Sequence, residues 1–360
     1  MTEDILKPDD PAPNLRAAVL TAYERHTLRR VFIVAGLVAA LVTSVLADLA
    51  IGASSLSLVD VVRAILWTDE TDYNTLIIIW DVRMPAALMA VPVGMALSLA
   101  GAEMQTILNN PLASPFTLGV SAAAAFGAGL AIVLGLGLPG IPTSWLITVN
   151  AFAFAFGSLL LLLSLTRVRG AGVDSLVMFG IALGFTFSAL LGLLQFVASA
   201  DALQQLVFWT MGSLTRASWE AIAILAVVIL LALPFSLGAS WKLTALRLGD
   251  DRARSFGIDV TRLRFFSLLR ISILAATSVA FVGAISFIGL VGPHIARLII
   301  GEDHRFFLPA SVLTGAVVMS LADIASKSIV PGVIVPVGIV TSLVGLPVFF
   351  SLILRRRERL

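Results

Sequence analysis

The sequence predicts an all-α membrane protein with ten transmembrane helices. Three observations lead to this fold class. Of the 360 residues, 59% are hydrophobic and 13% are charged; the mean hydropathy is +1.01; and long apolar runs recur along the chain. A soluble chain of this length would need charged and polar side chains over much of its surface. We therefore expect lipid to cover most of this one.

Each apolar run long enough to cross a hydrocarbon core of about 30 Å is expected to form one helix. Six such runs precede a charged segment at residues 241–264. They are Val31–Ala50, Pro85–Leu108, Phe116–Leu134, Trp145–Leu165, Leu176–Val197 and Ala221–Leu237. The first run is too long for the core of a signal peptide, so we expect an uncleaved first helix.

The apolar stretch Phe266–Ile300 must be divided to complete the topology. As one helix it would be about 52 Å long, at about 1.5 Å per residue, which is too long for one ordinary crossing. Residues 289–293 hold two glycines and Pro293, so we expect the break there. Leu308–Ile329 and Pro336–Leu354 then complete the ten helices.

The positions of the 24 lysines and arginines predict the orientation. With both termini in the cytoplasm, Arg270 starts the seventh helix and the only basic residues outside are Arg63, Arg83, Arg216 and Lys327. This distribution follows the positive-inside rule. The expected organisation is a cytoplasmic tail at 1–30, one ten-helix domain at 31–354 that includes a cytoplasmic loop at 241–265, and a cytoplasmic basic tail at 355–360.

Two blocks of the chain show weak internal similarity. Helices 2–5 and helices 7–10 each begin with a Val-Gly pair, Val93-Gly94 or Val282-Gly283. Each block then has a proline break, at Asn110-Pro111 or Gly292-Pro293, followed by a short helix. The blocks enter the membrane from opposite sides, which is the arrangement of inverted repeats in transporters.

The chain offers few residues for catalysis. None of its lysines follows a glycine as the P-loop lysine does, so we do not expect this chain to hydrolyse ATP. It has no cysteine, and its three histidines lack metal-ligand spacing, so we expect no metal site. An intramembrane enzyme would have to pair Ser121 or Ser286 with His294.

We expect few ionisable residues at membrane depth: Glu103 in the second helix and Asp323 in the ninth. Carriers driven by an ion gradient usually display carboxylate or histidine relays there. A secondary transporter remains an alternative, but this scarcity favours energy supplied by another subunit.

Five long motifs follow one another along the chain. They are RMPAALMAVPVGMALSLAGAEMQTILNNPLASPFTLGVSAAAAFGAG (Arg83–Gly129), QQLVFWTMGSLTRASW (Gln204–Trp219), LGDDRARSFGIDVTRLR (Leu248–Arg264), FIGLVGPHIARLIIGEDHRFFLP (Phe287–Pro309) and PVGIVTSLVGLPVFF (Pro336–Phe350). In this order they resemble the FecCD-type permeases of bacterial ABC importers, and the resemblance extends from about residue 30 to the C-terminus.

This resemblance implies a permease of the bacterial inner membrane that imports an iron–siderophore complex, haem or cobalamin. It implies a second permease subunit, identical or different, two cytoplasmic ATPase subunits and an external substrate-binding protein that is periplasmic or lipid-anchored. ATP and Mg would then be bound by the ATPase subunit, and no cofactor is expected on this chain. Membrane lipid is an expected partner and nucleic acid is not.

The resemblance also implies that part of the charged segment couples the permease to the ATPase. The residues concerned are Leu248, Gly249, Asp250, Ala253, Arg254, Gly257 and Ile258. Read from the residues alone, the segment consists of two short helices broken at Gly249 and Gly257. A basic loop held near anionic lipid explains such a segment as well.

At the outer face, the resemblance implies that Arg83 and Lys327 receive acidic residues of the binding protein, with Arg216 a weaker candidate. Each could instead be a residue whose charge reaches the membrane interface. The family often has a second arginine where this chain has Ala86, so docking there is expected to be weaker or shifted.

The resemblance places the translocation pathway between two subunits, lined by the fifth and tenth helices. The corresponding small or polar residues are Gly180, Gly184, Ser188, Gln195, Gly338, Thr341, Ser342 and Gly345. Tight helix packing explains such stripes equally well. Val173 and Asp174 match the cytoplasmic gate, although an acidic residue there departs from the family pattern, as does Ile334 where an acidic residue is usual.

Overall fold

The structure is a computed structural model, and it describes residues 13–52, 56–68, 71–137, 139–142, 145–168 and 173–357. Ten helices have at least 13 residues: α1 (Pro13–Ala50), α4 (Met84–Ile107), α5 (Val120–Leu134), α6 (Leu146–Val168), α7 (Val173–Val197), α9 (Trp219–Gly238), α12 (Val260–Val282), α13 (Ile288–Ile300), α14 (His304–Ser328) and α15 (Val337–Arg357). Shorter α-helices are α2 (Leu58–Leu66), α3 (Tyr73–Ile77), α8 (Ala200–Thr210), α10 (Ser240–Leu246) and α11 (Asp250–Ser255). The described residues also include the π-helix η2 (Ile78–Arg83) and the 3-10 helices η3 (Pro115–Leu118) and η5 (Leu214–Arg216).

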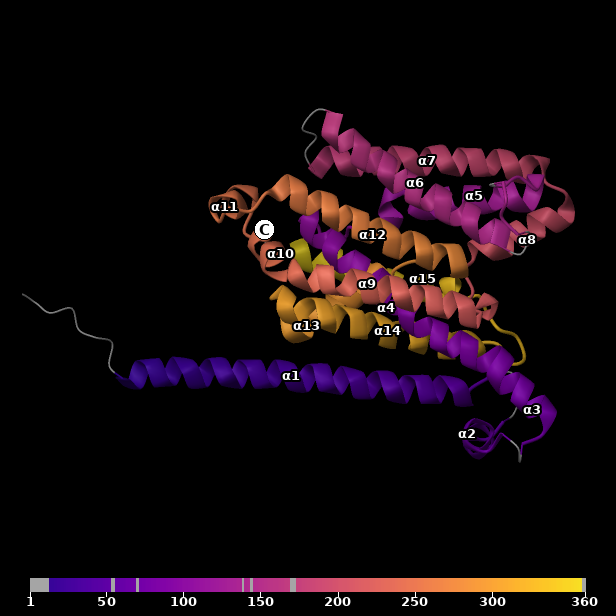
Figure 1. Cartoon of the computed structure of the whole chain (residues 1–360), viewed down its shortest axis with the longest axis horizontal. Coiled ribbons are helices and arrows are strands. Elements are labelled where there is room, and N and C mark those ends of the chain that lie inside the picture. The colour runs from indigo at the N-terminus through magenta and orange to yellow at the C-terminus, as the bar shows by residue number, and fades with distance from the viewer. Residues whose placement is uncertain are drawn as a thin grey trace, which may run out of the picture.

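Most of the long helices run along the long axis of the molecule (Figure 1). Helices α10 and α11 lie at one end of this bundle and α2 and α3 at the other, and we call these the α11 end and the α2 end. Helix α1 follows one flank of the bundle. Among the described residues, the β-type pairing is limited to an isolated bridge between Val330 and Val333.

Seven helical segments in the described ranges are long and apolar enough to cross a membrane, and α5, α13 and α15 add three shorter apolar helices. Each predicted apolar run corresponds to one of them, so the prediction of a polytopic helical membrane protein is confirmed. Two boundaries differ most from expectation. Helix α1 begins at Pro13, inside the predicted tail, and α3, η2 and α4 form one continuous span, Tyr73–Ile107.

The predicted break at residues 289–293 is wrong. The chain leaves helical geometry after Val282, with Gly283 at φ +77° and Phe287 at φ +66°, and Pro293 lies inside α13. Proline cannot donate to the carbonyl four residues earlier. Here that carbonyl, on Gly289, accepts a hydrogen bond of 3.4 Å from the side chain of Gln105. The helix therefore continues through the proline.

Gly283 and Gly289 both allow close backbone contact, and only Gly283 turns the chain. A Cβ on Gly283 would lie 2.4 Å from the carbonyl oxygen of Trp209. Gly289 instead faces α4, where a Cβ on Gly101 would lie 1.8 Å from the carbonyl oxygen of Gly289. Small residues let membrane helices approach closely. The glycines at 289 and 101 thus serve a helix crossing, which is why no break occurs there.

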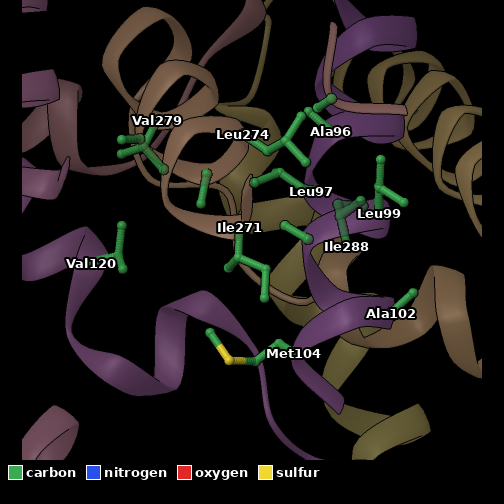
Figure 2. Close-up of a cluster of buried hydrophobic side chains, with 14 of the residues drawn as sticks. Ala96, Leu97, Leu99, Ala102, Met104, Val120, Ile271, Leu274, Val279 and Ile288 are labelled. Atoms are coloured by element: carbon green, nitrogen blue, oxygen red, sulfur yellow. The ribbon is translucent and has the colours of Figure 1, made fainter. Parts of the chain in front are cut away.

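Helix α4 is the centre of the bundle. It packs against α9, α12, α13 and α14, and nearly all of its residues are buried. Figure 2 shows Leu97 and Met104 of α4 in one apolar cluster with Ile271 and Leu274 of α12. A helix that is apolar on every side is expected to lie inside a membrane bundle.

The packing pattern supports the inverted repeat more clearly than the sequence does. Helix α4, the first of one block, packs along α14, while α12, the first of the other block, packs along α6. Each block therefore places its first helix against the third helix of the other block. The two Val-Gly pairs are not equivalent, because Val93 and Gly94 lie within α4 whereas Val282 ends α12.

Candidate functional site

Two short helices at the α11 end form the segment expected to couple the protein to a partner. Helix α10 ends before Gly249, at φ +103°, and α11 ends before Gly257, at φ +78°. Side chains other than glycine rarely adopt positive φ. The predicted division of the segment at these two glycines is confirmed.

Three of the seven expected coupling residues hold the segment onto the bundle. Ala253 and Ile258 are buried. Asp250 accepts two hydrogen bonds of 2.8 Å from Arg264, and the same guanidinium donates to the carbonyl oxygen of Ile107 at the end of α4. A bidentate pair of this kind fixes orientation as well as distance. Helix α11 is therefore braced against α12 and α4.

The exposed face of the segment is formed by different side chains. Leu248 and Phe256 are 53% and 54% exposed. Arg254 pairs with Asp251 at 3.6 Å, but the two side chains are 61% and 99% exposed, and such surface pairs contribute little to stability. Arg254 is therefore available to a partner. Phe256 was not predicted as part of this exposed face, although an aromatic residue within a charged segment could have pointed to it.

Arg247 connects α10 to two loops of the bundle. Its guanidinium donates to Asn109, which follows α4, at 3.1 Å, and to Glu302, which precedes α14, at 2.6 Å. Glu302 also pairs with Arg297 of α13 at 3.2 Å. The sequence gives no signal for this network, because its members lie far apart in the chain.

His304 joins α10 to α4 inside the bundle. The buried imidazole lies 2.8 Å from the hydroxyl of Thr106 on α4 and 3.2 Å from that of Thr244 on α10. The hydroxyl of Thr244 also accepts the backbone N–H of His304. A displacement of α10 must therefore disturb contacts with both α4 and α14.

Two of the three expected docking residues are buried, which corrects the expectation that they face outward. Arg83 is 5% exposed and donates to the carbonyl oxygens of Leu49 and Ala50, both at 3.0 Å. The last carbonyls of a helix lack partners within that helix, so Arg83 satisfies the end of α1. Ala86, the departure from the family pattern, is also buried.

Lys327 lies between two buried carboxylates. Its ammonium is 2.7 Å from Asp48 of α1 and 2.6 Å from Asp323 of α14, and its side chain is 6% exposed. Asp48 was not predicted as a functional residue, although an aspartate near the end of an apolar run is a recognisable signal. The cation is held within the protein by this pairing.

Arg216 is exposed at the α2 end. Its guanidinium donates to the carbonyl oxygen of Phe208 at 2.8 Å. It lines a hollow of about 690 Å³ together with Asp201 and Glu220. Of the three docking candidates, Arg216 is the one that a partner could reach.

The small residues expected in the pathway are used largely for packing inside the subunit. On α7, a Cβ on Gly180 would lie 2.4 Å from the side chain of Leu118, and one on Gly184 would lie 3.3 Å from Gly119. Ser188 is exposed and Gln195 is half-buried. Tight helix packing therefore accounts for both glycines.

The stripe on α15 also faces the interior. Gly338 packs against the carbonyl oxygens of Met211 and Ala284, Gly345 packs against Phe287, and Thr341 is 4% exposed. Ser342 is half-buried and donates to the carbonyl oxygen of Gly338. The faces left exposed are apolar and large: Met178, Phe185 and Phe196 on α7, and Leu343, Val344 and Phe350 on α15.

The two expected gate residues, Val173 and Asp174, are the first residues of α7, but their side chains are not among those that the structure describes. Ile334 lies in the loop before α15 and is 38% exposed.

The charges at membrane depth are paired. Glu103 of α4 is fully buried, forms an ion pair of 2.6 Å with Arg270 of α12, and accepts a hydrogen bond from Ser236 of α9. Among the described residues, no group of three or more His, Cys, Asp or Glu side chains could hold a metal ion. The Ser121 hydroxyl has no hydrogen-bond partner among the described residues.

Comparison with known proteins gives a consistent picture. The model of the FecCD transport family matches residues 40–355. The hemin transport system permease protein HmuU of Yersinia pestis is 36% identical over 312 residues, which are 86% of this chain and 93% of that protein. The molybdate import system permease protein MolB of Haemophilus influenzae is 35% identical over 328 residues, which are 90% of this chain and 95% of that protein.

A solved structure agrees with these relatives. A metal-chelate type ABC transporter in an inward-facing conformation matches with a TM-score of 0.76 at 32% identity, covering 90% of this chain and 99% of that chain.

Proposed function

The chain belongs to the FecCD transport family, and from this premise we propose that it is the transmembrane permease subunit of an ABC importer. The proposed cargo is a metal chelate, with an iron–siderophore complex first and haem or cobalamin next. Energy comes from ATP, with Mg, on two separate ATPase subunits. A substrate-binding protein delivers the cargo from outside, and a second permease subunit completes the pathway.

The observation that carries this proposal is the construction of the α10–α11 segment. Its outer face offers Leu248, Arg254 and Phe256, while Asp250 and Arg264 brace its inner face against α4 and α12. A partner that moves the exposed face must also move the contacts of His304 and Arg247. This arrangement can transmit the opening and closing of an ATPase to the bundle.

The proposed orientation places the α11 end in the cytoplasm of a bacterium and the chain in its inner membrane. Most lysines and arginines lie toward this end, as the positive-inside rule requires. The binding protein then docks at the α2 end, where Arg216 and Arg63 are exposed. This docking site replaces the one first expected at Arg83 and Lys327.

The pathway is proposed to lie between the exposed faces of α7 and α15 of two permease subunits. Phe185 is 75% exposed and Leu343 is 66% exposed, so these faces are available to a second subunit or to cargo. A wide, mostly apolar surface suits a large chelate, because such a cargo needs no dedicated set of ligands. Val173 and Asp174 keep their proposed place at the cytoplasmic gate.

Cargo identity must be measured. The named relatives HmuU and MolB, a hemin and a molybdate permease, are almost equally similar to this chain. The chain is to be reconstituted in vesicles with its ATPase and binding protein. ATP hydrolysis is then measured with the binding protein empty or loaded with ferric siderophore, haem, cobalamin or molybdate. Stimulation together with uptake is expected for one iron chelate.

Two results would overturn the proposal. If molybdate alone stimulates hydrolysis, the chelate assignment fails while the importer assignment holds. If uptake follows an ion gradient in vesicles that contain no ATPase subunit, the chain is a secondary transporter instead.

A further inference from the structure

A groove with a volume of about 1080 Å³ lies between α9 and α12. Its inner walls are apolar, and Leu231 and Phe235 of α9 are 63% and 68% exposed. Ile273 and Leu269 of α12 line the other wall. Both helices are apolar enough to span a membrane, so this part of the groove lies at the depth of the acyl chains.

The mouth of the groove, at the α11 end, has a different chemistry. Lys242 of α10 and Arg262 of α12 both line it and are exposed, and no ion pair among the described residues includes either of them. Arg262 stacks over the Phe266 ring at 5.8 Å. Trp241 and Phe256 complete the mouth, with their rings 6.5 Å apart. Aromatic and basic side chains together are typical of the membrane interface.

The charges at the mouth do not cancel. Asp259 also lines it, but its carboxylate accepts the backbone N–H of Arg262 and so caps α12. Arg270, deeper in the groove, is neutralised by Glu103. One positive charge therefore remains in excess, directly above an apolar channel. A ligand that fits has a negative head and at least one long apolar chain.

We propose that this groove binds one anionic glycerophospholipid from the leaflet at the α11 end. Its phosphate lies between Lys242 and Arg262, and an acyl chain follows the walls formed by Phe235 and Ile273 down the groove. Basic pockets between membrane helices are suited to anionic headgroups, and each basic residue near such a lipid contributes about 1 kcal/mol. The apolar walls alone would accept any lipid, and the two cations select the anionic one.

The binding test uses the purified chain and does not depend on the proposed transport function. Native mass spectrometry follows the binding of phosphatidylglycerol and of phosphatidylcholine. The unsubstituted protein is expected to retain one phosphatidylglycerol. The double variant Lys242→Gln/Arg262→Gln should bind it about thirtyfold more weakly, because two contributions of about 1 kcal/mol are lost. The control Arg29→Gln/Arg252→Gln removes two exposed cations that do not line the groove and should bind normally.

A second variant tests the apolar part. An added Cβ at Gly238, which lines the groove, meets no atom within 4 Å, so a side chain at this position has room to start into the groove, and Gly238→Phe is chosen to fill it. Gly36 on α1 is equally open, and Gly36→Phe is its control. Gly238→Phe should abolish retention of phosphatidylglycerol, while Gly36→Phe leaves it unchanged.

Three outcomes would overturn the inference. Equal affinity for phosphatidylglycerol and phosphatidylcholine removes the role of the cations. Unchanged retention in both groove variants places the lipid elsewhere. Loss of the permease dimer in Gly238→Phe alone, measured by the mass of the complex, makes the groove an interface between two copies of the chain.

Discussion

Glu103, Asp48 and Asp323 show how single charges are accommodated at membrane depth. Each is buried and forms an ion pair. The partners of Glu103 and Asp48 come from distant parts of the chain, whereas Asp323 pairs with Lys327 within α14. Leaving a buried charge without its partner costs far more than the pair contributes. The roles of these residues are therefore decided by their neighbours.

Arg270→Met is predicted to destabilise the protein by about 3–5 kcal/mol, because it leaves Glu103 charged and unpaired. The double variant Glu103→Gln/Arg270→Met should recover most of this loss. Thermal unfolding followed by tryptophan fluorescence measures both. Arg305→Gln, which removes an exposed pair with Asp303, is the control and should cost less than about 1 kcal/mol. Equal stability of the single and double variants would contradict this account.

Helix α1 shows what decides the position of an element. It packs mainly against α14, and few of its side chains are buried. At the α2 end Arg83 and Lys327 hold it, and at the α11 end Arg30 pairs with Asp303 at 3.2 Å. A hydrogen bond from Arg305 is the main cause that lowers the pKa of Asp303. The ion pair between Arg30 and Asp303 therefore persists at neutral pH and is lost only as the pH falls through the lowered pKa of Asp303.

Lys327→Met is predicted to release the α2 end of α1, because it leaves Asp48 and Asp323 as two unpaired carboxylates in one buried site. Hydrogen exchange of residues 44–50 should then increase strongly, while that of α4 stays low. Neutralising all three residues, in Lys327→Met/Asp48→Asn/Asp323→Asn, should restore most of the protection. If the single variant is as protected as the unsubstituted protein, packing alone holds α1.

The α10–α11 segment gives a sharper test of an element, because Gly257 has open space but a positive φ. Gly257→Val is predicted to leave insertion and dimerisation normal, to cost at least about 1–2 kcal/mol of local backbone strain, and to uncouple ATP hydrolysis from uptake. Gly257→Asn tolerates the same φ and should keep most of the coupling. Measuring hydrolysis and uptake in the same vesicles separates the two effects. Normal uptake in the valine variant would refute the coupling role.

For the whole molecule, the absence of cysteine makes the orientation directly measurable. Single cysteines at Leu248, at the α11 end, and at Val59, at the α2 end, are both on exposed positions. In intact cells, a membrane-impermeant thiol reagent is predicted to label Val59→Cys and not Leu248→Cys, and both after lysis. Labelling of Leu248→Cys alone in intact cells would reverse the proposed topology.

The sequence alone determined the number and approximate positions of the apolar helices, the two glycine breaks around α11 and the family resemblance. These properties are local. Partitioning into lipid depends on the length and composition of an apolar run, and a positive φ is adopted readily only by glycine.

Only the tertiary structure decided where the long apolar stretch breaks, that Arg83 and Lys327 face inward, and that Gly338 and Gly345 pack against their own subunit. The physical reason is that each outcome depends on a partner from elsewhere in the chain: Gln105 for the carbonyl freed by Pro293, the end of α1 for Arg83, and Asp48 for Lys327. Burying a charge is costly unless it is paired, so a charged side chain can leave the surface only where such a partner is present.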